Sequence, residues 1–107
     1  MASAEARDGA EAVKLVEDLH PRVVVMDINM PRMNGIEATG SIIRKHPHLP
    51  VIGLSFYVGN GNREALLDAG ACLLLEKGTA YQHLPYAIYQ AVGKSLEAPS
   101  SADRLVA

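Results

Sequence analysis

Three reactive side chains each follow a short apolar run in this sequence: the Asp27 carboxylate, the Ser55 hydroxyl and the Lys77 ammonium. A carboxylate can attack phosphorus as a nucleophile and become an aspartyl phosphate. The new dianion needs positive charge close by, which a lysine supplies as a mobile point charge. A hydroxyl can donate a hydrogen bond to a phosphoryl oxygen. These three residue types are therefore suited to phosphoryl transfer if the fold brings them together.

The apolar runs before these residues predict the strands that would position them. Residues 23–26 are four consecutive apolar residues, three of them β-branched, with no polar residue between them. This pattern predicts a strand that is buried on both faces, as in a parallel sheet. Residues 51–54 and 72–75 form two similar runs. Because parallel strands point the same way, the three polar side chains should lie at one edge of the sheet.

Each of the three residues also has a simpler interpretation. Asp27 fits a solvated residue at a strand end, Ser55 fits a turn residue, and Lys77 fits a solvated side chain after a strand. Their common placement after three parallel strands favours the functional interpretation for all three.

Helical segments alternate with the strands. Residues 10–19 place Ala12, Val13, Val16 and Leu19 on one helical face, and Asp8 is suited to cap this helix. A second helix is expected at residues 36–45, with Ile36, Gly40 and Ile43 on its inner face. Two more helices are expected at residues 63–69 and after Gly78 and Thr79. Residues 2–6 suggest an edge strand. The alternation predicts an α/β domain with a parallel sheet, of about four strands and four helices.

The chain length allows one domain. With 107 residues there is room for a single core. We expect the domain to cover residues 1–95, and we expect residues 96–107, which include an Ala-Pro-Ser-Ser segment, to be a linker or a disordered tail. Cys72 cannot form an internal disulfide because it is the single cysteine, and its apolar surroundings in the sequence predict a packed interior position.

Composition and charge exclude several classes of function. No apolar run approaches the roughly 20 residues of a membrane span, and the first residues lack the apolar core of a signal peptide. The net charge of −2 argues against direct binding of nucleic acid by this domain. These features together predict a cytoplasmic protein.

The segment after the first buried run identifies a family resemblance. Asp27, Met30, Pro31, Asn34 and Gly35 form an Asp-x-x-Met-Pro-x-x-Asn-Gly pattern. It resembles the phosphoacceptor segment of the response-regulator receiver domain, the receiving half of bacterial two-component signalling. The resemblance runs over about residues 4–92 and implies a flavodoxin-like, doubly wound parallel sheet.

The resemblance also implies a role for each site residue. Asp27 would be the phosphoacceptor, Ser55 the switch hydroxyl and Lys77 the phosphate-binding lysine. A Mg²⁺ ion would be held by Asp27 and by the backbone carbonyl of Asn29, since this ion prefers oxygen ligands and helps phosphoryl transfer by offsetting charge.

The sequence departs from the family pattern at its N-terminus. The first strand and first helix of the family are missing, and with them the acidic pair that supplies metal carboxylates. We therefore expect weak Mg²⁺ binding, and either a dimer or larger assembly that covers the gap or a loosely folded chain. Leu74 stands where many relatives have an aromatic residue. Gly78 replaces a proline after the lysine, as in many receivers that precede DNA-binding output domains.

Two functional hypotheses follow from the resemblance. The first is a receiver that accepts phosphoryl on Asp27 from a histidine kinase or a phosphotransfer protein and then switches its C-terminal strand–helix face. Such a domain takes part in its own phosphorylation but is not a dedicated enzyme. The second is a degenerate pseudo-receiver that binds protein partners whatever its phosphorylation state. The kinase, the signal and the output domain are not specified by the sequence.

Overall fold

The computed structural model describes residues 3–29, 34–56, 59, 61–92 and 104–107. Its elements alternate along the chain as the sequence predicts. In order they are β1 (Ser3–Glu5), α1 (Gly9–Leu19), β2 (Val23–Asp27), α2 (Gly35–Lys45), β3 (Val51–Ser55), α3 (Asn62–Asp68), β4 (Leu73–Glu76), α4 (Lys77–Val92) and β5 (Arg104–Val106).

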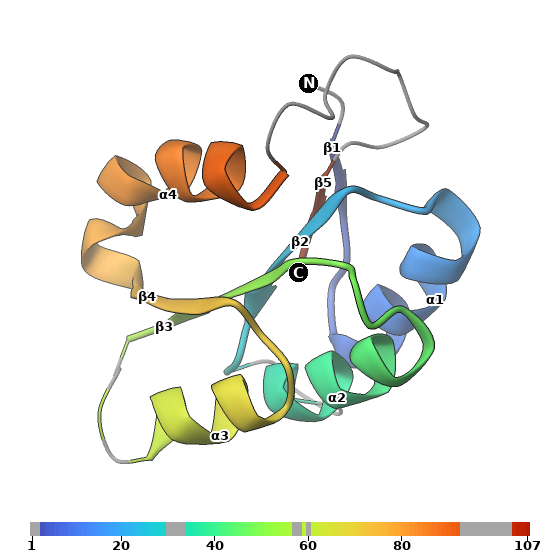
Figure 1. Ribbon diagram of the computed structural model, residues 1–107, viewed down its shortest axis with the longest axis horizontal. Helices are drawn as coiled ribbons and strands as arrows, with labels where there is room; N and C mark the ends of the chain where they lie inside the picture. The colour runs from blue at the N-terminus through green and yellow to red at the C-terminus, as the bar shows by residue number, and fades with distance from the viewer. Residues whose placement is uncertain (1–2, 30–33, 57–58, 60, 93–103) are drawn as a thin grey trace.

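All five strands belong to one parallel sheet, in the order β1-β5-β2-β3-β4 (Figure 1). If β5 is counted as the first strand, this order becomes 2-1-3-4-5, which is the flavodoxin-like arrangement of a doubly wound sheet. The predicted fold class is therefore confirmed. The sheet has five strands rather than the four or so that the sequence indicated, because β5 joins it.

Strand β5 corrects two expectations about the ends of the domain. Residues 96–107 were expected to be a linker or a tail, yet Arg104–Val106 pairs with β1 on one side and β2 on the other. Strand β2 was expected to have an uncovered edge, and β5 covers it. Leu105 explains the placement, since its side chain is fully buried in the core. The rest of the expected tail, up to residue 103, lies outside the described residues.

The helices cover both faces of the sheet (Figure 1). Helices α1, α2 and α3 lie on one face, where Val24 and Met26 of β2 pack with Leu66 and other residues of these helices. Helix α4 lies on the other face, where Val23 and Val25 pack with Ile88. Successive side chains of a strand point to opposite faces, so an unbroken apolar run serves both cores. This confirms the burial that the run in β2 predicts.

Two short polar side chains begin the first two helices. The Asp8 carboxylate accepts a hydrogen bond from the Glu11 N–H at 2.9 Å, as predicted for a helix cap. The Asn34 side chain accepts one from the Glu37 N–H at 2.9 Å. Asn34 also donates to the Glu37 carboxylate, so the start of α2 is fixed from both directions.

Candidate functional site

The Asp27 carboxylate lies at the C-terminal end of β2, and both of its oxygens have partners. Oδ2 accepts a hydrogen bond from Lys77 Nζ at 2.7 Å. Oδ1 accepts one from the Asn29 N–H at 2.8 Å. The side chains of Asp27 and Lys77 keep 27% and 23% of their surface exposed, so the pair remains accessible to a small molecule. The structure therefore brings together the predicted nucleophile and the predicted cation, which are 50 positions apart.

Lys77 owes its position to an abrupt change of secondary structure. Glu76 ends β4 and Lys77 begins α4, with no loop between them. The sequence suggested that this helix would begin after Gly78 and Thr79, so the helix begins earlier than expected. The result is that the cation bonded to Asp27 is itself the first residue of α4.

Ser55 lies at the end of β3 and is buried. Its hydroxyl donates a hydrogen bond to the Asn29 side-chain oxygen at 3.3 Å. The structure thus joins Ser55 to the site through Asn29. The roles proposed for Asp27, Ser55 and Lys77 remain predictions, while their common location at one edge of the sheet is a feature of the structure.

Two contributions at this site escaped the sequence interpretation. Asn29 was expected to contribute only its backbone carbonyl, but its N–H holds Asp27 and its side chain accepts from Ser55. Phe56 was not singled out, although the centroid of its ring lies 4.4 Å from Lys77 Nζ. The sequence does carry a signal for this contact. Phe56 directly follows Ser55 at the end of one strand and Lys77 directly follows the neighbouring strand, so the two side chains should lie near each other.

The position of Gly35, after the turn that follows Asp27, has no room for a side chain. A Cβ atom at this position would approach the Ile28 Cα to 2.6 Å and would also meet the Asp27 carbonyl oxygen. The start of α2 therefore packs directly on the backbone that carries the carboxylate. Met30 and Pro31 of the same pattern lie outside the described residues.

The donor set for a cation is small. Asp27 offers a carboxylate and Asn29 a backbone carbonyl. No group of three or more His, Cys, Asp or Glu side chains able to hold a metal ion occurs within the described parts of the chain. Mg²⁺ often binds through one or two carboxylates and keeps several waters. The residues present are therefore compatible with a Mg²⁺ ion held largely by water.

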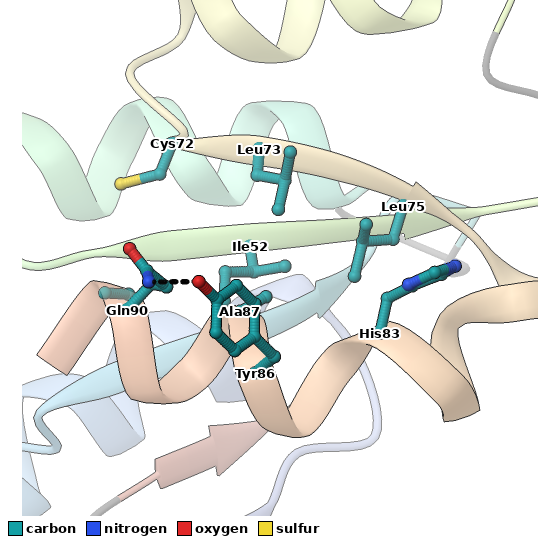
Figure 2. Close-up of a pocket in the computed structure, with 9 residues that line it drawn as sticks. Ile52, Cys72, Leu73, Leu75, His83, Tyr86, Ala87 and Gln90 are labelled. Atoms are coloured by element: carbon teal, nitrogen blue, oxygen red, sulfur yellow. Dashed lines mark hydrogen bonds between the residues drawn. The ribbon is translucent and has the colours of Figure 1, made fainter.

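A second feature lies on the α4 face, away from Asp27. A hollow of about 510 Å³ opens between β3, β4 and α4, as Figure 2 shows. The Tyr86 hydroxyl, which accepts a hydrogen bond from Gln90 Nε2 at 2.7 Å, lies on one side of it, and Cys72 lies on the other. Cys72 was expected to pack in the interior, but it is exposed. Residue 72 begins the apolar run of the sequence, whereas β4 begins at Leu73, so Cys72 lies just outside the strand.

The comparisons with known proteins decide the family. The family model for the response regulator receiver domain matches residues 1–89. This chain belongs to that family. In this receiver β5 occupies the place in the sheet that the first strand has in the flavodoxin-like order.

Three relatives indicate the proteins in which such receivers occur. The receiver is 33% identical over 103 residues to response regulator GacA of Pseudomonas protegens, covering 95% of this chain and 48% of that protein. It is 47% identical over 75 residues to a protein-glutamate methylesterase/protein-glutamine glutaminase of Myxococcus xanthus, covering 68% of this chain and 21% of that protein. A crystal structure of a LuxR-family DNA-binding response regulator from Staphylococcus aureus matches with a TM-score of 0.74 and 29% identity, covering 80% of this chain and 72% of that one.

The chain thus spans less than half the length of these two curated relatives. Within the described residues, no helix of the receiver combines the length and apolar character needed to cross a membrane.

Proposed function

We propose that this receiver accepts a phosphoryl group on Asp27 from a histidine kinase or a phosphotransfer protein. The observation that carries the proposal is the 2.7 Å contact between Lys77 Nζ and Asp27 Oδ2. A lysine held against a partly exposed carboxylate supplies the positive charge that an aspartyl phosphate requires. The family membership supports the same reaction.

In the proposed reaction an oxygen of Asp27 forms a bond to phosphorus. The bond between phosphorus and the histidine nitrogen of the donor breaks, and that nitrogen keeps the electron pair. The Asn29 N–H holds Oδ1 and fixes the orientation of the carboxylate. Lys77 offsets the added negative charge on the new dianion.

A bound Mg²⁺ ion would supply further charge compensation for the transferring phosphoryl group. Asp27 and the backbone carbonyl of Asn29 would hold it. The donor set described above favours weak binding, because a single carboxylate supplies the protein charge at this position.

The proposed response to phosphorylation is a shift of α4. Lys77 is the first residue of this helix, so a change in the position of its ammonium acts directly on the helix start. Ser55 is placed to turn toward a phosphoryl oxygen from its bond with Asn29. The hollow beside Tyr86 lies on the face that would change, which makes this β4–α4 face the output surface of the proposal.

Phosphorylation with a small phosphodonor and Mg²⁺ tests the acceptor. The 107-residue chain should gain one acid-stable and base-labile phosphoryl group. Asp27→Asn should remove it, because an amide is a poor nucleophile. Labelling of the Asn variant at the wild-type level in mass spectrometry would show that another residue is the acceptor.

The proposed partners follow from the family. A kinase or phosphotransfer protein would donate the phosphoryl group, and a DNA-binding output domain would receive the signal in a longer protein. The LuxR-family neighbour from Staphylococcus aureus is a DNA-binding response regulator, which supports this expectation. Self-association into a homodimer is a further expectation. We place the receiver in the cytoplasm, without a catalytic activity beyond its own phosphorylation.

A pseudo-receiver is the second candidate. The small donor set for Mg²⁺ favours it, since weak metal binding would slow phosphorylation. Partner binding that is equally tight for the wild type and for Asp27→Asn, with and without phosphodonor, would support this candidate. Binding that changes only when Asp27 is phosphorylated would support the switching receiver.

A further inference from the structure

Phe56 is an exposed aromatic residue beside the acceptor site. Its side chain keeps 65% of its surface exposed, so burial in the core does not explain its presence. It follows Ser55 directly at the end of β3. It is also the single phenylalanine of the chain.

Sheet register explains why this ring meets Lys77. Ser55 and Glu76 are paired in the parallel ladder between β3 and β4. Both strands end at this pair, and the next residue is Phe56 after β3 and Lys77 after β4. Neighbouring parallel strands lie about 4.8 Å apart, so these two side chains leave the sheet next to each other.

The Lys77 ammonium is therefore held from two directions. The Asp27 carboxylate is 2.7 Å from Nζ, and the centroid of the Phe56 ring is 4.4 Å from it. The face of a phenyl ring carries negative charge density and attracts a cation at this distance. The ring also limits the rotamers of a long side chain that would otherwise lose entropy when it binds the carboxylate.

We propose that Phe56 is a positioning residue that holds the Lys77 ammonium against Asp27 and so prepares the site for phosphoryl transfer. The link to phosphoryl transfer rests on the function proposed above. The positioning itself is a property of the unphosphorylated receiver. Phe56 acts through Lys77 and needs no contact with the transferred group.

A first test uses fluorinated phenylalanines. Because the chain has one phenylalanine, an auxotrophic host supplied with 4-fluorophenylalanine modifies this ring alone, and site-specific incorporation gives the trifluoro and pentafluoro forms. Each added fluorine weakens the negative face while the ring shape stays nearly constant. The phosphorylation rate with a small donor should fall stepwise along the series while Tm stays constant. A flat series would overturn the electrostatic role of the ring.

A second test uses substitutions with a matched control. Phe56→Leu removes the ring and keeps an apolar side chain, and it should slow phosphorylation by about two- to fivefold, the range expected for an exposed cation–π contact. Phe56→Tyr keeps the ring face and should retain the wild-type rate. Tyr89→Leu removes another exposed ring, on α4, and should leave the rate unchanged. Equal rates for Phe56→Leu and the wild type would overturn the proposal.

NMR of the unphosphorylated receiver separates this proposal from the proposed function. The Lys77 ε-methylene protons should show an upfield ring-current shift that disappears in Phe56→Leu, and the Asp27 carboxyl carbon should shift as its ion pair loosens. If both signals are unchanged in Phe56→Leu, the positioning role is wrong. If they change but the wild type accepts no phosphoryl group, the positioning stands and the function proposed above fails.

Discussion

At the scale of single residues, Asp27 and Lys77 form the pair on which the proposed chemistry depends. Their positions were predictable because each follows an apolar run that indicates a strand of a parallel sheet. The contact of Phe56 with Lys77 was not predictable in the same way. It depends on the register between β3 and β4, and the apolar runs of these strands carry no alternation of polar and apolar residues that would specify it.

Replacement of Lys77 tests the charge at the site. Lys77→Ala should strongly impair phosphorylation of Asp27, because the dianion loses the cation that is hydrogen-bonded to its carboxylate; a hydrogen bond to a charged group is worth about 1.5–3 kcal/mol. Quantification of phosphorylated protein by mass spectrometry measures the effect. Lys14→Ala, an exposed lysine on α1, provides the control. Full labelling of the Lys77 variant would remove Lys77 from the proposed mechanism.

Two glycines of α2 provide a test variant and a matched control for the close packing of this helix on the backbone next to Asp27. Gly35→Ala should destabilise the receiver by about 1–3 kcal/mol, because its Cβ would press on the backbone of Ile28. Gly40→Ala has no atom within 4 Å of the new Cβ and should stabilise the helix by about 0.5–1 kcal/mol. Urea unfolding of both variants measures the two changes. A more stable Gly35→Ala variant would contradict the close approach.

At the scale of elements, the strands were easier to predict than the faces of the helices. The runs in β2 and β3 are fully apolar, so their burial followed from composition. Helix α2 was assigned an inner face of Ile36, Gly40 and Ile43. Ile36 and Ile43 do pack against the core but are only partly buried, and the fully buried residues of this helix are Gly35, Ala38, Thr39 and Ile42. The periodicity of this helix is ambiguous, because isoleucines lie on both sides of the buried face and the Thr39 hydroxyl bonds back to the Gly35 carbonyl.

A substitution at Ser55 can separate the proposed shift of α4 from the phosphorylation of Asp27. Ser55→Ala should leave labelling of Asp27 largely intact and weaken the response of the helix, because the bond to Asn29 and its proposed exchange for a phosphoryl oxygen are both lost. Chemical-shift changes across β4 and α4 upon phosphorylation provide the measurement. Shift changes of wild-type size in this variant would exclude Ser55 as the switch.

Helices α1 and α2 are joined by an ion pair with a predictable pH dependence. The His46 ring bonds to the Glu17 carboxylate at 3.0 Å and, with Lys45, lowers the pKa of Glu17 below its ordinary value of 4.5. A lowered pKa in the folded state adds stability above the ordinary pKa, and this contribution is lost as the pH falls through the lower value. Glu17→Gln should therefore be slightly less stable than the wild type at pH 7, and the difference in Tm should vanish once the pH falls below the lowered pKa of Glu17. A difference that is constant with pH would exclude this linkage.

At the scale of the whole molecule, β5 determines how the domain is closed. No sequence pattern predicts this strand, since three residues are too few to show a period. Leu105 is fully buried, so Leu105→Ala should cost about 2–5 kcal/mol. Leu67→Ala, in an exposed position on α3, should cost much less. Equal losses for both variants in thermal or urea unfolding would show that β5 does not stabilise the receiver.

Removal of residues 104–107 should recreate the gap that the sequence interpretation placed beside β2. The edge of β2 would then be unpaired and would invite pairing with another chain. The shortened chain should associate or unfold, because a small domain has only about 5–15 kcal/mol of stability to lose. Sedimentation of the full and shortened chains at several concentrations measures this. An unchanged, cooperative monomer after the removal would contradict the role of β5.

The position of β5 also has a consequence for synthesis on the ribosome. Domains usually begin to fold from their N-terminal end as the chain emerges. Here β1 pairs only with β5 among the described strands, and about 100 residues separate the two in the sequence. Strand β1 must therefore wait for β5, and the nascent receiver exposes the edges of both β1 and β2 until residues 104–106 have emerged. Chaperones that shield such edges should matter more for this receiver than for one whose central strand is translated first.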